Sequence, residues 1–191
     1  EGHYTAERDR RHHECANQVL VPPRDLDYSA GATLPWRLQP DIAGAVISTT
    51  LLRTSSTCCK TSSVIVEAEG MCANRAGLYQ AEDSVSACFR FEGGLPGSGS
   101  WCFVGHKSAK EDCIEVIGDK GMLCFSVYNY DPIRLVTSEG TTSITVPNPP
   151  YVQLPIIKAV IEDLQGLGVC SCTGVSATPV NWVMDRILGK F

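Results

Sequence analysis

The sequence has no long apolar run, no excess of basic charge and no basic leader. No stretch reaches the about 18 consecutive apolar residues that suggest a membrane-spanning helix. Its 16 Lys and Arg and 21 Asp and Glu are scattered along the chain, so nothing favours a surface for nucleic acid or anionic membranes. The first residues are charged and rich in histidine, unlike a secretion signal. These absences predict a cytoplasmic protein with a small-molecule partner and without nucleic acid or membrane.

A Gly-x-Gly-x-x-Gly motif after a strand is also missing. Gly97-Ser98-Gly99 falls in a predicted hairpin, where it cannot cradle a pyrophosphate. The 191 residues suffice for one domain with a proper core and are too few for a dinucleotide domain plus a substrate domain. We therefore expect an irregular N-terminal segment, 1–19, followed by one domain, 20–191.

Ten cysteines raise the question of disulfides or metal ligands. Cys88, Cys102, Cys113 and Cys124 alternate with apolar residues in strand-like runs, where a reduced thiol behaves as a small hydrophobe. A chain of this length does not need disulfides for stability. Reduced structural cysteines are the preferred interpretation, ahead of disulfides and, last, of metal ligation. The run 12–15, His-His-Glu-Cys, is interpreted as a solvated tail, because adjacent residues rarely converge on one ion.

From Val64 onward, apolar and polar residues alternate with period two in short runs, which predicts strands. The predicted strands are 64–69, 84–91, 99–104, 113–117, 122–127, 133–137 and 141–146. They are separated by turn-forming segments such as 118–121 and 130–132. Such short gaps join antiparallel neighbours, since a parallel pair needs a crossover of a dozen or more residues. The sequence therefore predicts an open, largely antiparallel sheet.

The pattern changes after Pro147. Apolar residues recur every four positions in 151–165, which predicts an amphipathic helix. A second helix is predicted for 176–188, with Ser176 as its N-cap and Gly189 at its end. Its inward-facing residues are predicted to be Val180, Val183, Met184, Ile187 and Leu188. Two helices packed on one face of a sheet make an α+β domain.

Several motifs, in order, resemble those of a known family. They are 82–103 with its Gly-Gly turn and Gly-Ser-rich second strand, Leu34-Pro35-Trp36-Arg37, and the closing segment 181–189. The chain resembles the C-terminal domain of the Gfo/Idh/MocA (glucose-fructose oxidoreductase, inositol dehydrogenase and MocA) oxidoreductases over roughly 20–45 and 64–191. The resemblance implies an NAD or NADP cofactor, a sugar or polyol substrate, and a homo-oligomer formed through the open sheet face. The family's N-terminal Rossmann domain is expected to be absent.

The resemblance also implies where the site residues fall. It places Trp36 and Arg37 beside the substrate and the nicotinamide. The family's helix with a catalytic Asp and His corresponds to 45–63, a Ser/Thr-rich stretch without periodicity, where Thr50 and Thr54 occupy those two positions. Shifting the reading frame by one base permits a family-like helical sequence there. We therefore hypothesise a compensated frameshift, and expect the printed chain to be marginally stable and inactive by itself.

Further binding candidates come from the residues alone. Asn74, Arg75 and Tyr79 lie in a polar segment between strands, where binding groups are often carried. His106 is expected to face solvent. Two alternatives to the oxidoreductase domain remain: a non-catalytic assembly module derived from it and, if the thiols are oxidised, an extracellular β domain with disulfides.

Overall fold

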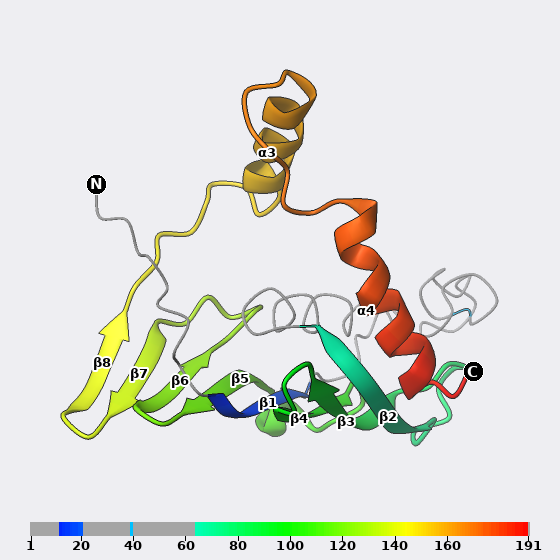
Figure 1. Ribbon diagram of the computed structural model, residues 1–191. Coiled ribbons are helices and arrows are strands. Elements are labelled where there is room, and N and C mark those ends of the chain that lie inside the picture. Colours follow the sequence, from blue (N-terminus) through cyan, green and yellow to red (C-terminus); the bar gives the residue numbers. More distant parts are fainter. Residues whose placement is uncertain (1–11, 21–38, 40–63, 191) are drawn as a thin grey trace.

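The computed structural model describes residues 12–20, 39 and 64–190 (Figure 1). Its eight strands are β1 (His12–Leu20), β2 (Ile65–Ala73), β3 (Ser84–Phe91), β4 (Pro96–Cys102), β5 (Glu111–Gly118), β6 (Gly121–Phe125), β7 (Ile133–Thr137) and β8 (Gly140–Ile144). The helices are η3 (Lys107–Ala109), α3 (Leu154–Leu164) and α4 (Gly174–Ile187).

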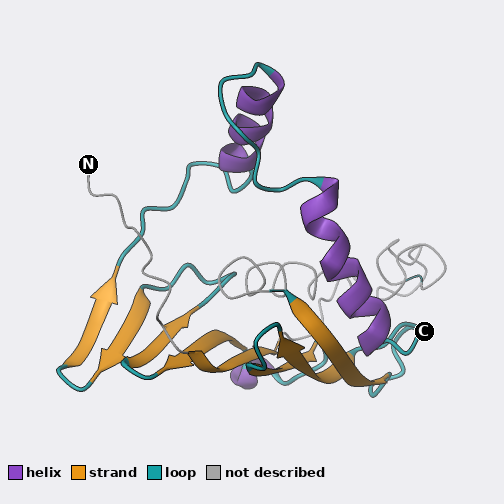
Figure 2. Cartoon of the chain, in the orientation of Figure 1, coloured by secondary structure: helices purple, strands orange, loops and turns teal. Residues whose placement is uncertain are grey.

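The strands form one sheet in the order β2-β3-β4-β1-β5-β6-β7-β8, which spreads along the lower part of Figure 2. Every neighbouring pair is antiparallel except β1 with β4. The predicted α+β class with an open, largely antiparallel sheet is therefore confirmed. The turns between β5 and β6 and between β7 and β8 use Gly121 and Gly140 with positive φ.

The N-terminal segment differs from the prediction. Residues 12–19 were expected to be irregular, but they belong to β1, which lies in the middle of the sheet. This strand is parallel to β4 and antiparallel to β5. The facing edges of β4 and β5 each carry a row of backbone donors and acceptors, and β1 satisfies both rows. Local periodicity does not predict this strand, because backbone pairing with distant segments forms it.

Helix α4 packs against β2 at the end of the sheet. Val180, Val183, Met184 and Ile187 are buried there, as predicted. The approach is close: a Cβ on Gly70 would lie 2.6 Å from the Cγ2 atom of Ile187.

The ends of α4 show which residues cap it. Thr173, rather than Ser176, is the N-cap, and the two residues form a reciprocal capping box. The helix therefore begins two residues before the predicted start. Gly189, with φ of 67°, follows the helix where a glycine is expected.

Helix α3 differs from the prediction in its packing. The helix forms where the period of four predicted it, yet none of its residues is buried, and Figure 1 shows it standing away from the sheet. Its exposed apolar side chains are Leu154, Ile156, Ile157, Val160, Ile161 and Leu164. Within the described part of the chain, the predicted cover of the sheet face comes from α4.

Candidate functional site

The polar segment between β2 and β3 is organised by Asp83. This carboxylate is completely buried and accepts hydrogen bonds from the backbone N–H groups of Arg75 (2.8 Å) and Ala76 (2.9 Å) and from the hydroxyl of Ser84 (3.0 Å). Its backbone N–H donates to the carbonyl of Ala73. Asp83, at the end of this loop, therefore holds the start of the loop at Arg75 and Ala76 by hydrogen bonds. The sequence analysis missed it, although a buried acid just before a strand is a recognisable loop anchor.

Two of the predicted binding residues shape this loop. The amide of Asn74 donates to the carbonyl of Tyr79, and its Oδ1 accepts from the N–H of Gly77 at 2.8 Å. The Tyr79 side chain is buried. Arg75, in contrast, is exposed. Of the three candidates, Arg75 is therefore the one whose side chain is placed to meet a ligand.

A hollow of about 350 Å³ opens beside Arg75, at the ends of β2, β3 and β4. The hydroxyl-bearing residues Ser84, Ser86 and Ser100 line it together with Trp101. A guanidinium fork and hydroxyls are groups that bind small polar molecules. Met71, Val85 and Cys102 add apolar lining, so the hollow is of mixed character.

Trp101 lies between Ser100 and Cys102 of this lining, and its side chain is buried in the core on the other face of the sheet. Its ring contacts Phe89 edge-to-face, with centroids 6.4 Å apart, and lies over Gly99, where a Cβ would come within 2.2 Å of a ring carbon. The glycine-rich β4 therefore makes room for an indole from its own strand. The Nε1 atom of Trp101 is buried and makes no hydrogen bond, which leaves an unused donor in this part of the core.

A second buried acid, Asp112, holds a loop on the other side of β1. Its Oδ2 accepts from the backbone N–H groups of Val127 (2.9 Å) and Tyr128 (2.5 Å). Its Oδ1 is buried without a hydrogen-bond partner. Register places Asp112 and Trp101 beside the same residue of β1, Val19, and hence on one face of the sheet.

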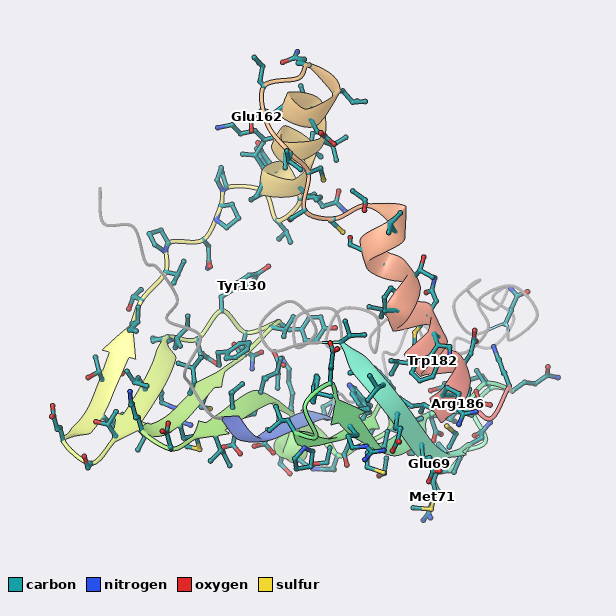
Figure 3. All side chains as sticks on the ribbon, viewed as in Figure 1. Glu69, Met71, Tyr130, Glu162, Trp182 and Arg186 are labelled. Carbon is teal, nitrogen blue, oxygen red and sulfur yellow. The ribbon has the colours of Figure 1, made fainter. Side chains whose placement is uncertain are left out.

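A charged hollow of about 440 Å³ lies further along β2 and β3, next to α4. Glu67, Glu69, Arg90 and Arg186 line it, and Arg90 forms an ion pair with Glu67. Arg186 also lies 6.0 Å above the ring of Trp182, and both residues are labelled on α4 in Figure 3. Arg90 is thus engaged with Glu67 and Arg186 with Trp182, so this hollow is the weaker candidate.

The remaining predicted residues divide into two groups. Trp36, Arg37, Thr50 and Thr54 lie outside the described residues. His106 is exposed, as expected, and its ring Nδ1 accepts from the N–H of Ser108 at 3.3 Å, capping η3. In the described part of the chain, no helix is long and apolar enough to cross a membrane.

Solved structures with the same fold include levoglucosan dehydrogenase in complex with NADH, with a TM-score of 0.79, 15% identity and 94% of this chain covered. The WlbA dehydrogenase of Bordetella pertussis, in complex with NADH and UDP-GlcNAcA, matches 94% of this chain with a TM-score of 0.73 and 16% identity. Biliverdin reductase of Synechocystis, in complex with biliverdin and NADP+, matches 94% of this chain with a TM-score of 0.72 and 17% identity.

The chain spans 56%, 53% and 54% of the length of these three proteins, respectively. No protein-family model matches the sequence, and no curated protein is detectably similar to it. The structural likeness is to Gfo/Idh/MocA-type oxidoreductases and is consistent with their C-terminal domain. The chain therefore has the fold of this part of a Gfo/Idh/MocA-type oxidoreductase.

Proposed function

We propose that this chain is the substrate-binding and oligomerising portion of an NAD(P)-dependent oxidoreductase that acts on sugars, polyols or related CH–OH groups. The observation that carries the proposal is the fold shared over 94% of the chain with a sugar dehydrogenase that is more than half as long again. The exposed Arg75 and the hydroxyls that line the hollow beside it support a polar substrate.

The chemistry explains why these 191 residues are proposed to be inactive alone. Hydride transfer from a CH–OH carbon to a nicotinamide needs a positioned base for the hydroxyl proton. By resemblance, an Asp and a His would stand at Thr50 and Thr54, and neither threonine can serve as that base. A compensated frameshift across 45–63 would explain why threonines stand at both positions. The cofactor would bind a separate domain, outside the 191 residues.

Nucleotide sequencing across codons 1–70 and several hundred bases upstream tests the proposal. We expect a frame slip and an upstream segment that encodes a Gly-x-Gly-x-x-Gly domain. The corrected, extended protein is then assayed for NAD+ and NADP+ reduction with an anhydrosugar and a cyclic polyol, with the 191-residue chain as control. Activity only in the extended protein supports the proposal. A clean frame with nothing upstream contradicts it and favours a non-catalytic assembly module.

The exposed sheet face supports the oligomerising role. The face opposite α4 carries Glu69, Met71, Ser86 and Cys88, and Met71 is 78% exposed. Figure 3 shows Glu69 and Met71 on the side of β2 away from α4. We propose that a second copy of the chain covers this face. Because Met71 and Ser86 also line the hollow beside Arg75, that hollow would then lie at the contact between the two copies.

Sedimentation velocity with the variant Met71→Glu tests the contact between copies. We expect a dimer or larger species for the parent chain and a shift toward monomer for the variant. Val175→Glu, at an exposed position on α4, is the control and should leave the distribution unchanged. A parent chain that sediments as a monomer at every concentration would contradict the proposed contact.

A further inference from the structure

Two cysteines and a glutamate converge on β5 and β6. The Sγ atoms of Cys113 and Cys124 lie 3.2 Å apart, and the two sulfurs and a carboxylate oxygen of Glu115 all lie within 4.8 Å of one another. Glu115 is directly opposite Cys124 in the antiparallel register, and Cys113 is two residues away on the same face of β5. Paired strands, rather than a loop, therefore hold all three groups.

The register favours a metal ion over a disulfide between the two sulfurs. Cys113 and Cys124 are diagonal neighbours, a relation that separates Cα atoms by about 7–8 Å, whereas disulfides rarely exceed about 6.8 Å. A zinc ion bound at about 2.3 Å from each sulfur in a tetrahedral site sets the sulfurs about 3.8 Å apart. The sulfurs reach that separation by a small side-chain adjustment.

The charges around the cluster also fit a divalent cation. Two thiolates and one carboxylate carry three negative charges, of which a divalent ion neutralises two. The guanidinium of Arg134, whose Nη2 is 3.1 Å from the Sγ of Cys124, neutralises the third. Cys124 is buried, and Cys113 and Glu115 are half-buried, so the ligands are only partly hydrated.

We propose that Cys113, Glu115 and Cys124 bind a thiophilic divalent cation such as Zn²⁺, with water as the fourth ligand. Sulfur, nitrogen and carboxylate ligands in sets of three with an open position are typical of zinc. The site lies on the sheet face opposite α4, because Ile114, between Cys113 and Glu115, is in the core with α4. It is separate from the hollow beside Arg75.

Cobalt titration of the reduced 191-residue chain tests the site. We expect one Co²⁺ per chain, a near-ultraviolet band from charge transfer between thiolate and cobalt, and displacement by Zn²⁺. Cys113→Ser and Cys124→Ser should each lose the tight binding, and Glu115→Gln should weaken it about tenfold or more. Cys172→Ser removes an exposed thiol that lies just before α4 and should keep the full signal.

Alkylation of the unmutated chain keeps the test independent of variants that fail to fold. Zn²⁺ should protect Cys113 and Cys124 from iodoacetamide, while Cys172, which is exposed, continues to react. The proposal is overturned if no thiolate band develops, if the band survives in both serine variants, or if Zn²⁺ leaves the alkylation of the pair unchanged. Formation of a Cys113–Cys124 disulfide without metal uptake would overturn it in favour of a redox pair.

Discussion

At the residue scale, β4 shows why a glycine-rich strand belongs in this core. Gly99 leaves space for the indole of Trp101 two residues further along the same strand, and Phe89 of β3 contacts that indole from its edge. Glycine within a strand is typical of a place where another group approaches the backbone closely. The structure shows that the group that approaches is the strand's own tryptophan.

Gly99→Val should destabilise the chain by about 1–3 kcal/mol, because the new side chain overlaps the Trp101 ring in a packed interior. Urea unfolding followed by tryptophan fluorescence measures the change. Gly105→Ala is the control, because its Cβ would meet only the Sγ of Cys102 at 3.9 Å. Equal midpoints for the two variants would show that the indole does not occupy the described position.

Cys72 gives a prediction for alkaline pH. Burial, and then the negative charge of Glu82, raise the pKa of its thiol above the ordinary value of 9.0. The folded chain therefore holds this proton more tightly than the unfolded chain, and the resulting stabilisation is lost as pH rises above about 9. Cys72→Ala should flatten the decline of unfolding free energy with pH in this range. Urea unfolding at several pH values compares the slopes, and identical slopes would contradict the prediction.

At the element scale, α4 is the helix that packs on the β2 end of the sheet. Its buried stripe meets β2 and follows the three- and four-residue spacing of its apolar residues in the sequence. The capping box at Thr173 fixes where the helix begins, while Gly70 allows Ile187 to approach the strand closely. The prediction of this helix from sequence was correct in type and buried face, and two residues late at its start.

Ile187→Ala should cost about 2–5 kcal/mol of unfolding free energy, because it leaves a cavity at the contact between α4 and β2. Val175→Ala, at an 85% exposed position of the same helix, is the matched control and should change stability by less than about 0.5 kcal/mol. Chemical denaturation followed by circular dichroism provides the measurement. A small effect at Ile187 would mean that α4 does not dock on β2.

At the scale of the whole molecule, the exposed apolar surface of α3 favours association between chains. Ile157 and Ile161 are each about half exposed and Leu164 is 83% exposed, so the helix presents a continuous apolar stripe. Exposed patches of this kind promote association. We therefore expect this stripe to make the chain prone to aggregation on heating.

Replacing Ile157 and Leu164 together by lysine should delay aggregation on heating without lowering the unfolding free energy, because neither side chain is buried. Light scattering during a thermal ramp and urea unfolding test the two parts of this expectation. Val175→Lys adds a charge at an exposed position of α4 and serves as the control. A loss of more than about 2 kcal/mol in the double variant would show that the stripe is covered in the folded chain.

The sequence by itself determined the elements whose periodicity is local. The strands after Val64, the turns at Gly121 and Gly140, and the buried stripe of α4 follow from alternation, turn chemistry and helical spacing. The family resemblance added the fold, which the structure confirms. The roles assigned to Trp36, Arg37, Thr50 and Thr54 remain predictions.

Only the tertiary structure decided which residues meet across the chain. It placed β1 between β4 and β5, made Asn74 and Tyr79 parts of a loop that Asp83 anchors, and left Arg75 beside a hollow. It also brought Cys113 and Cys124 together, although metal ligation was the least favoured interpretation of the cysteines. The physical reason is the same in each case: strand register and buried hydrogen bonds join distant segments, and no local pattern records that pairing.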